Sequence, residues 1–312
     1  MAGVGDLPKD NHTHRRITLT DWIAGGRYVD YRGHRIFVRD AGPADAEALV
    51  LIHGFPTASW DFEALWPDLA QRYRVYTLDM IGFGVSAKPA GYEYSLVDQA
   101  TLFESWLSRE GVTAYHVLAH DYGDSVAQEL LARQREPGPR PALRSVAFLN
   151  GGLFPETHRP LLMQRLLLSP LGPIIGRLAS RGRLADSMRR IFGSATPPDE
   201  DLIDGFWSLV TANDGRAVMH KLIGYLRERH VRRARWVGAL QDAPVPLKLI
   251  DGAADPVSGA HMAQRYRELV HAADVTLLEG IGHYPQIEAP AAVLDAYVVF
   301  RQRVGASQRS SA

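Results

Sequence analysis

Short apolar segments alternate with longer segments of helical spacing along most of the chain. Residues 26–40 alternate in polarity on both sides of Arg32-Gly33, which predicts two strands joined by a tight turn. Apolar runs predict six further strands, at 47–54, 74–80, 114–120, 144–150, 246–252 and 274–280. Helical spacing is found near 60–70, 95–110, 122–135, 260–271 and 290–304. This alternation favours an α/β fold in which a mostly parallel, eight-stranded sheet is flanked by helices on both faces.

One long interval, residues 151–240, contains helical spacing but no strand pattern. It lies between two segments that are predicted to be strands of the same sheet. Because open α/β sheets bind ligands at the carboxyl edge of their strands, we interpret this interval as a helical cap inserted over that edge. The chain then divides into a polar N-terminal segment (1–26), a core in two parts (27–150 and 241–305), the cap (151–240) and a flexible tail (306–312).

The composition excludes several classes of function. The 312 residues include 35 basic and 35 acidic side chains, so no net charge attracts nucleic acid, and the basic run 227–236 is interpreted as a solvated helix face. No cysteine is present, which excludes disulfides and thiolate chemistry and suits a reducing compartment. We see no signal peptide and no apolar run of the roughly 18 residues that a membrane helix needs. We therefore expect a cytoplasmic protein without a membrane span, and the sequence leaves its oligomeric state open.

The segment "HVLAHDYGDSVAQELL" contains the strongest chemical signal. A nucleophile on a sharp turn between strand and helix needs small residues two positions before and two after it. Ala119 and Gly123 stand in those places around Asp121. Gly123 and Ala127 bracket Ser125 in the same way, but the strand ends near His120, so Ser125 would lie one turn inside the helix. We therefore predict that Asp121 is the nucleophile; the structural alternative is an aspartate that only caps the helix.

Two further segments supply the partners that an attacking carboxylate needs. His283, in "GIGHYPQIEAP", follows the last predicted strand and is the expected base for a hydrolytic second step. Asp255, in "DGAADPV", follows the preceding strand and is expected to orient the histidine, with Asp251 as a weaker candidate at the strand end. Nucleophile, acid and histidine thus follow one another along the chain at the ends of predicted strands.

The loop "HGFPTASW", residues 53–60, directly follows another predicted strand. There the backbone N–H of Phe55 is expected to join that of Tyr122 in holding developing negative charge. We also single out a set of residues near these motifs as candidates to line the substrate pocket: His53, Pro56, Trp60, His120 and Trp207. We expect no metal and no cofactor, and water and a small apolar molecule as the reaction partners.

These motifs resemble the α/β-hydrolase superfamily, in the branch with aspartate nucleophiles that includes epoxide hydrolases and haloalkane dehalogenases. "HGFPTASWDF", "HDYGDSVAQELL", "NGGLFPETHRPLL" and "GHYPQIEAP" are most similar to the mesoderm-specific transcript protein family, over about residues 27–303. The resemblance implies an α/β-hydrolase fold with an inserted cap and an Asp-Asp-His triad. That family is described only as hydrolases, so the resemblance implies little about the substrate.

A carboxylate nucleophile points to attack at a saturated carbon, as in an epoxide or an alkyl halide. An epoxide needs a proton donor from the cap, and by resemblance to epoxide hydrolases we expect Tyr225, with His158 as a second donor. Epoxide hydrolysis is therefore the first hypothesis. The alternative is haloalkane dehalogenation, although Tyr122 and Phe55 stand where dehalogenases typically place tryptophan and asparagine, so that Trp60, Trp207 or Trp236 would have to bind the halide.

Two further alternatives remain open at this point. Ester or lactone hydrolysis at Asp121 would use the same triad. A non-catalytic binding or receptor module on a hydrolase fold belongs to a different class, and the presence of His283 argues against it, because binding alone does not require a base.

Overall fold

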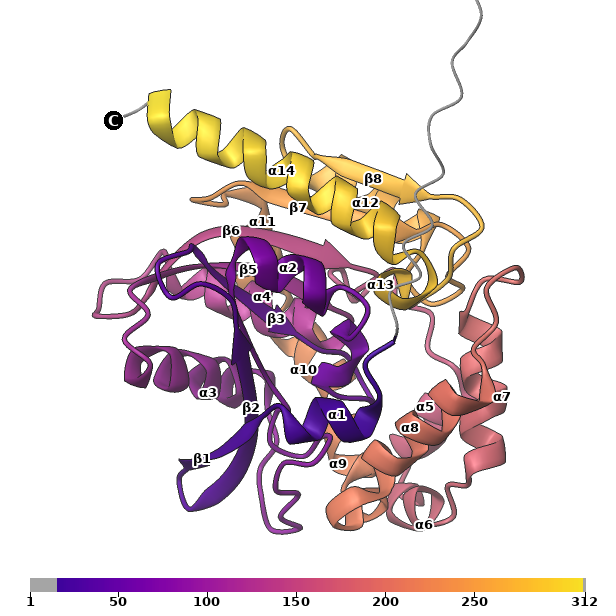
Figure 1. Cartoon of the computed structure of the whole chain (residues 1–312). Coiled ribbons are helices and arrows are strands. Elements are labelled where there is room, and N and C mark those ends of the chain that lie inside the picture. The colour runs from indigo at the N-terminus through magenta and orange to yellow at the C-terminus, as the bar shows by residue number, and fades with distance from the viewer. Residues whose placement is uncertain (1–15, 311–312) are drawn as a thin grey trace, which may run out of the picture.

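An eight-stranded sheet runs through the middle of the molecule (Figure 1), in a computed structural model that describes residues 16–310. The strands are β1 (Arg27–Tyr31), β2 (His34–Ala41), β3 (Ala48–Ile52), β4 (Arg74–Leu78), β5 (Ala114–His120), β6 (Ala142–Leu149), β7 (Leu247–Gly252) and β8 (Val275–Leu278). Their order in the sheet is β1-β2-β4-β3-β5-β6-β7-β8. Only the β1–β2 and β2–β4 pairs are antiparallel. The predicted fold class is confirmed, because strands buried on both faces carry the continuous apolar runs that the sequence shows.

Helices make up most of the remaining structure. They are α1 (Leu19–Ala24), α2 (Trp66–Arg72), α3 (Leu96–Arg109), α4 (Tyr122–Arg133), α5 (Leu162–Leu167), α6 (Gly172–Arg177), α7 (Arg181–Ile191), α8 (Glu200–Thr211), α9 (Met219–Leu222), α10 (Tyr225–Val231), α11 (Arg233–Gln241), α12 (Ala260–Leu269), α13 (Pro285–Glu288) and α14 (Pro290–Ser310), with short 3₁₀ turns η1 (Ser59–Phe62) and η2 (Ala212–Ala217).

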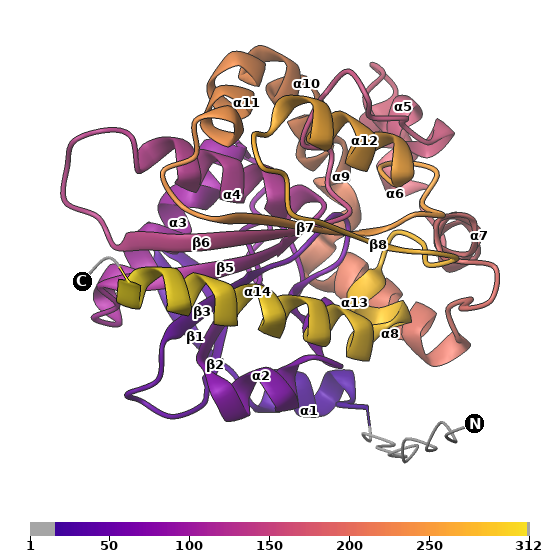
Figure 2. The ribbon, with the colours of Figure 1, turned by 90° about the horizontal axis from the view of Figure 1, so that it is seen from above.

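The helices form two layers around the sheet. Figure 2 shows α3, α4, α11 and α12 on one face, and α1, α2 and α14 on the other. Each layer buries its own apolar cluster: Trp106 and Tyr122 belong to the first, and Trp22, Trp66 and Tyr297 to the second. Because β3 and β5 to β8 run parallel, the loops at their carboxyl ends meet at one edge of the sheet.

Helix α1 lies within the predicted polar N-terminal segment but is part of the folded core. The Thr18 hydroxyl accepts a hydrogen bond from the Asp21 N–H and caps the helix. Trp22 is buried, and its indole N–H donates to the Ser59 hydroxyl. A helix of six residues is too short to show a periodic pattern, which explains why the sequence did not reveal it. Residues 1–15 of the predicted segment lie outside the described residues.

The interval that we interpret as a cap contains α5 to α11. Figure 1 shows α5–α8 at the edge of the sheet toward which the arrows of β6 and β8 point. Helix α11, by contrast, lies beside α4 in the layer that covers the sheet, where the Trp236 indole N–H donates to Glu129. The division between core and cap at residue 240 stays a prediction, because α11 packs on α4 of the core whereas α5–α8 lie at the edge of the sheet.

At the C-terminus, helix α14 continues through Ser310, whereas the sequence predicted a flexible tail from residue 306. No proline interrupts this stretch, so nothing in its backbone stops the helix there. Residues 311–312 lie outside the described residues. None of the helices within residues 16–310 combines the length and the apolar character that a membrane span requires.

Candidate active site

Asp121 occupies the sharp turn between β5 and α4. Its φ of 47° and ψ of −103° place it in a conformation that is rare for a residue with a side chain. Two residues later, a Cβ on Gly123 would lie 2.3 Å from the Ile52 carbonyl oxygen, so only glycine lets the helix start this close to β3. The alternative nucleophile, Ser125, is fully buried one turn into α4, and its hydroxyl accepts a hydrogen bond from Arg229. The turn therefore presents Asp121 rather than Ser125.

Asp255 and His283 are in direct contact at the carboxyl edge of the sheet. Their side chains approach to 2.7 Å, between His283 Nδ1 and Asp255 Oδ2. The Asp255 carboxylate also accepts hydrogen bonds from the Val257 and Ser258 N–H groups. Asp251 is buried at the end of β7, and neither of its carboxylate oxygens has a hydrogen-bond partner among the described residues. The geometry therefore brings Asp255, and not Asp251, to the histidine.

Two polar residues that the sequence analysis did not single out hold Asp255 in place. The Asn150 amide donates to Asp255 Oδ2 at 3.1 Å and its oxygen accepts from the Gly252 N–H at 2.7 Å. The Ser258 hydroxyl lies 2.8 Å from Asp255 Oδ2. The sequence signal that could have pointed to this role is an asparagine directly after a predicted strand, because asparagine adopts a positive φ more readily than most residues. In the structure the φ of Asn150 is 40°.

The charged forms of Asp121, Asp255 and His283 stabilise one another. Burial alone would lower the pKa of His283, but the Asp255 and Asp121 carboxylates raise it to about 9. Burial would raise the pKa of both aspartates, yet His283 lowers the pKa of each; Arg229 adds to this effect at Asp121. For Asp251, burial and the nearby Asp255 charge raise the pKa well above its usual range. The resting site thus holds two carboxylates around one imidazolium.

The Phe55 backbone N–H donates to Asp121 Oδ2 at 3.0 Å. Tyr122 is the first residue of α4, so its N–H belongs to the end of the helix where amide groups lack partners within the helix. A donor on Oδ2 orients the carboxylate, and the other oxygen, Oδ1, lies 3.8 Å from Arg229 Nη2. The Phe55 N–H lies where an oxyanion would develop if water attacked an ester of Asp121.

Asp121 and His283 line a cavity of ≈ 90 Å³ between the sheet edge and the cap. Phe55, Pro56 and Trp207, which the sequence analysis had selected, line it as well. The cap supplies most of the remaining lining, which is largely apolar: Leu161, Met163, Leu167, Ile175, Leu184 and Met188. The volume and the lining fit a small apolar molecule.

Three of the residues selected as pocket candidates do not line this cavity. His53 accepts the Met80 N–H at Nε2 and faces the Gly54 carbonyl with Nδ1, so both ring nitrogens are committed to the backbone. Trp60 is buried against Phe206 and donates its indole N–H to the Ile17 carbonyl. His120 stands behind His283, with Nε2 2.8 Å from the His283 carbonyl oxygen. Sequence proximity to the motifs had suggested these residues, but their side chains point into the core.

The two cap residues proposed as proton donors lie around Asp121. Tyr225 is buried against Phe55 and Tyr122, and its hydroxyl has no hydrogen-bond partner among the described residues. Burial, and then the Asp121 charge, raise its pKa, so the hydroxyl stays protonated. Both ring nitrogens of His158 also lack partners, and burial and Arg229 lower its pKa to about 4. Buried polar groups without partners are uncommon. The Asp121 charge affects the pKa of both residues, but neither is among the residues that line the cavity.

Arg229 is a site residue that the sequence analysis missed. It belongs to the basic run 227–236, which was interpreted as a solvated helix face, but its side chain is only 1% exposed. Nη2 donates to the Asp121 carbonyl oxygen at 2.9 Å and lies 3.8 Å from Asp121 Oδ1. Its guanidinium also stacks over the Tyr225 ring, 4.4 Å from the centroid. For this position the interpretation as a surface charge was wrong, because the partners of Arg229 come from α4 and are distant in sequence.

With this fold and geometry in place, comparison with known proteins identifies the class. Residues 49–296 match the model of the alpha/beta hydrolase family, and the chain belongs to this family. It is 39% identical over 292 residues to the mesoderm-specific transcript protein of Mus musculus, covering 90% of this chain and 87% of that one. It is 40% identical over 279 residues to the putative hydrolase LipZ of Mycobacterium tuberculosis (strain ATCC 25618 / H37Rv), covering 89% and 96%. The protein is thus a hydrolase.

Solved structures share the fold at lower identity. Haloalkane dehalogenase DbeA from Bradyrhizobium elkani USDA94 superposes with a TM-score of 0.75 at 20% identity, covering 90% of this chain and 99% of that one. Epoxide hydrolase CorEH superposes with a TM-score of 0.72 at 20% identity, covering 89% and 99%. At this identity the likeness shows the fold alone, so the reaction must be inferred from the site itself.

Proposed function

We propose that this protein is a cofactor-independent hydrolase that opens small or medium apolar epoxides through a covalent ester on Asp121. The observation that carries the proposal is the arrangement around that carboxylate. One oxygen accepts the Phe55 N–H, and the unpaired hydroxyl of Tyr225 lies in the same buried cluster as Phe55. A nucleophile and a protonated donor next to an apolar cavity are what ring opening requires.

In the first step Asp121 Oδ1 attacks a ring carbon. A C–O ester bond forms, the C–O bond of the ring breaks, and the released oxygen takes the proton of Tyr225. His158, whose pKa is lowered to about 4, is neutral and can support the same oxygen only by donating a hydrogen bond. Arg229 stacks over the Tyr225 ring, and its positive charge stabilises the tyrosinate that remains. The ring oxygen thus gains a proton as its negative charge develops.

In the second step His283 takes a proton from water, and the hydroxide attacks the ester carbonyl carbon. The resulting oxyanion is held by the N–H groups of Phe55 and Tyr122. The acyl C–O bond then breaks, and the departing alkoxide takes the proton from His283 to leave as a diol. Asp121 is released as a carboxylic acid and passes its proton to His283, which restores the resting carboxylate and imidazolium. Formation of the ester removes the Asp121 charge, and this lowers the pKa of His283 relative to the free enzyme, where that charge helps to raise it. The resting proton of His283 then passes through solvent to the Tyr225 tyrosinate, which restores the hydroxyl and leaves His283 neutral to act as the base.

The experiment that tests this proposal is a screen of alkyl and aryl epoxides beside bromoalkanes of the same carbon skeleton, with diol and bromide measured separately. We expect diol release with epoxides, abolished in Asp121→Asn, and little bromide release. Turnover of esters or lactones alone, with no epoxide opened, would contradict the proposal.

Dehalogenation is the second candidate, and one observation favours it. Trp207 lines the cavity, and its indole N–H has no hydrogen-bond partner within the described part of the chain, so it is free to bind a halide. Trp60, whose N–H is committed to Ile17, serves as a matched control. Efficient bromide release that is lost in Trp207→Phe but kept in Trp60→Phe would favour this candidate over epoxide hydrolysis.

A further inference from the structure

Exposed apolar side chains are concentrated on one part of the cap. Eight large apolar side chains are exposed among the described residues, and five of them fall within residues 162–178: Leu162, Leu166, Leu171, Ile174 and Leu178. Their exposed fractions range from 38% for Leu166 to 69% for Leu162. Single exposed apolar residues are normal on a protein surface, but such a group on two short neighbouring helices marks an interaction surface.

Both helices are apolar on two faces. In α5, Met163 and Leu167 line the cavity, while Leu162 and Leu166, four residues apart, are exposed. In and directly after α6, Ile175 and Ala179 line the cavity while Ile174 and Leu178 are exposed. The inner face is explained by the cavity. The outer face needs a partner, because a helix that is apolar all round is not suited to lie in water.

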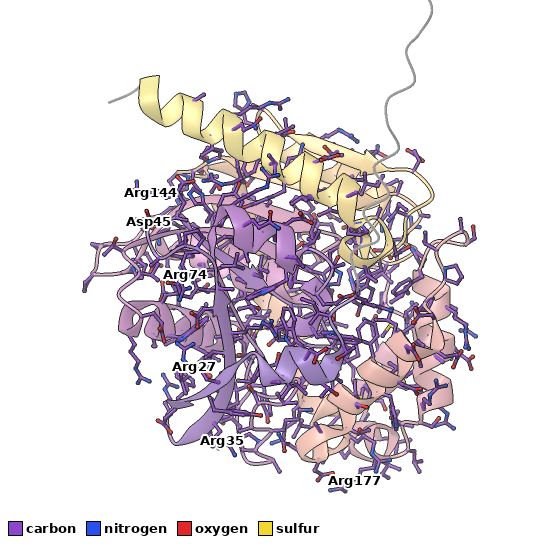
Figure 3. The ribbon with its side chains drawn as sticks, in the orientation of Figure 1. Arg27, Arg35, Asp45, Arg74, Arg144 and Arg177 are labelled. Atoms are coloured by element: carbon purple, nitrogen blue, oxygen red, sulfur yellow. The ribbon has the colours of Figure 1, made fainter. Side chains whose placement is uncertain are left out.

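The positive charge of this surface indicates a negatively charged partner. Residues 159–191 contain seven arginines and one aspartate, a net charge of +6, within a chain whose net charge is +0. Arg181 and Arg189 pair with Glu200 of α8. Among the residues that the structure describes, five others pair with no carboxylate; four of them do not line the cavity, namely Arg159, Arg165, Arg177 and Arg190, whereas Arg183 does. Arg177 lies at the outer margin of the cap in Figure 3.

We propose that this face of the cap, Leu162 to Leu178 with its arginines, docks on the surface of an anionic lipid bilayer. Exposed leucine and isoleucine side chains enter the boundary between headgroups and acyl chains, and the arginines contact the anionic headgroups. A second copy of this chain is a poor partner for the same face, because it would bring two positively charged segments together. Docking here would place the helices that line the cavity at a store of apolar molecules.

The test is co-sedimentation of the full chain with phosphatidylcholine vesicles that contain or lack phosphatidylglycerol. We expect binding to the anionic vesicles, weakened by added salt because the headgroup attraction is screened. Leu171→Ser/Ile174→Ser/Leu178→Ser should weaken binding by at least about tenfold, because three apolar side chains leave the interface. Arg165→Gln/Arg177→Gln should also weaken it by roughly tenfold or more. None of these five residues lines the cavity.

Val299→Ser is the matched control, since Val299 is exposed on α14, away from the cap, and its loss should leave binding unchanged. Equal binding to both kinds of vesicle, no binding, or binding that both cap variants retain would overturn the proposal. So would dimerisation of the free protein that the triple variant abolishes, which would assign the face to a second copy. Hydrolysis of a water-soluble substrate, measured on the same variants, reports separately on the proposed function.

Discussion

Arg229 Nη2 donates a hydrogen bond to the backbone carbonyl of Asp121 and lies 3.8 Å from its carboxylate, and the Arg229 side chain is buried. The same guanidinium donates from Nε to the Ser125 hydroxyl at 2.7 Å. Two residues, Asp121 in the turn and Ser125 in α4, are thus joined to the cap helix α10 by a single side chain. This relationship gives Arg229 a positioning role in the proposed mechanism: it holds the backbone of Asp121 and lowers the pKa of its carboxyl, but it does not line the cavity.

We expect Arg229→Gln to slow alkylation of Asp121 on the order of tenfold at neutral pH, equivalent to about 1.4 kcal/mol. Arg229 lowers the pKa of Asp121, so removing its charge should also move the acid limb of alkylation to higher pH. Arg229→Lys keeps the charge and should restore part of the rate. The measurement is single-turnover alkylation across acid pH. A slower reaction with an unmoved acid limb would mean that Arg229 is only structural.

Asp255→Asn should reduce turnover by up to ~10⁴-fold with little change in the folded structure, because His283 loses the carboxylate that fixes its tautomer and stabilises its charged form. Asp251→Asn is the matched control. Burial raises the pKa of Asp251 well above its usual range, so an amide replaces a group that is already neutral. Steady-state kinetics and circular dichroism on both variants test this. Loss of turnover in Asp251→Asn alone would move the acid to that position.

Tyr225→Phe should slow ring opening by roughly 10²–10⁴-fold, the usual contribution of a general acid, and should leave hydrolysis of the ester nearly unchanged. Its hydroxyl has no other partner among the described residues, so the substitution breaks no hydrogen bond seen in the structure. His158→Ala and the double variant separate the two donors. Following alkylation and hydrolysis in single turnover distinguishes the steps. If all three variants alkylate at the wild-type rate, neither residue is the acid.

The two steps should depend on pH in different ways. Alkylation needs the Asp121 anion, whose pKa is lowered, so its rate should stay constant near neutral pH and fall only as the carboxylate is protonated in acid. Hydrolysis needs neutral His283, whose pKa is about 9 in the free enzyme and lower once Asp121 is esterified. The hydrolysis rate should therefore rise with pH, with a midpoint below 9. Rapid-quench profiles of each step measure this, and a common midpoint for both would contradict the scheme.

The strands could be predicted from the sequence because parallel strands buried on both faces leave continuous apolar runs such as residues 47–54. The turn at Asp121 was also visible, since Gly123 is required by a close approach of backbone that any such turn makes. The directions in which side chains point could not be predicted from the sequence. His53, Trp60 and His120 stand within or beside the motifs, yet each points to a backbone carbonyl in the core.

Contacts between distant segments were the main part that the sequence did not reveal. Arg229 looks like one of many surface arginines until α4 is placed against α10, which brings Asp121 and Ser125 to its guanidinium. Asn150 and Ser258 support Asp255 for the same reason, from separate loops that meet only at the sheet edge. The catalytic roles of Asp121, His283 and Asp255 stay predictions that kinetics must test.

The central claim is that Asp121 forms the covalent bond, and intact-protein mass spectrometry of His283→Gln tests it most directly. The variant should attack an epoxide that the wild type turns over but should be unable to hydrolyse the ester. Asp121 and Ser125 both lie between Arg109 and Arg133, so fragmentation of that tryptic peptide must locate the adduct. We predict one added substrate mass, on Asp121. An adduct on Ser125, or none in a variant that has lost turnover, would contradict the account.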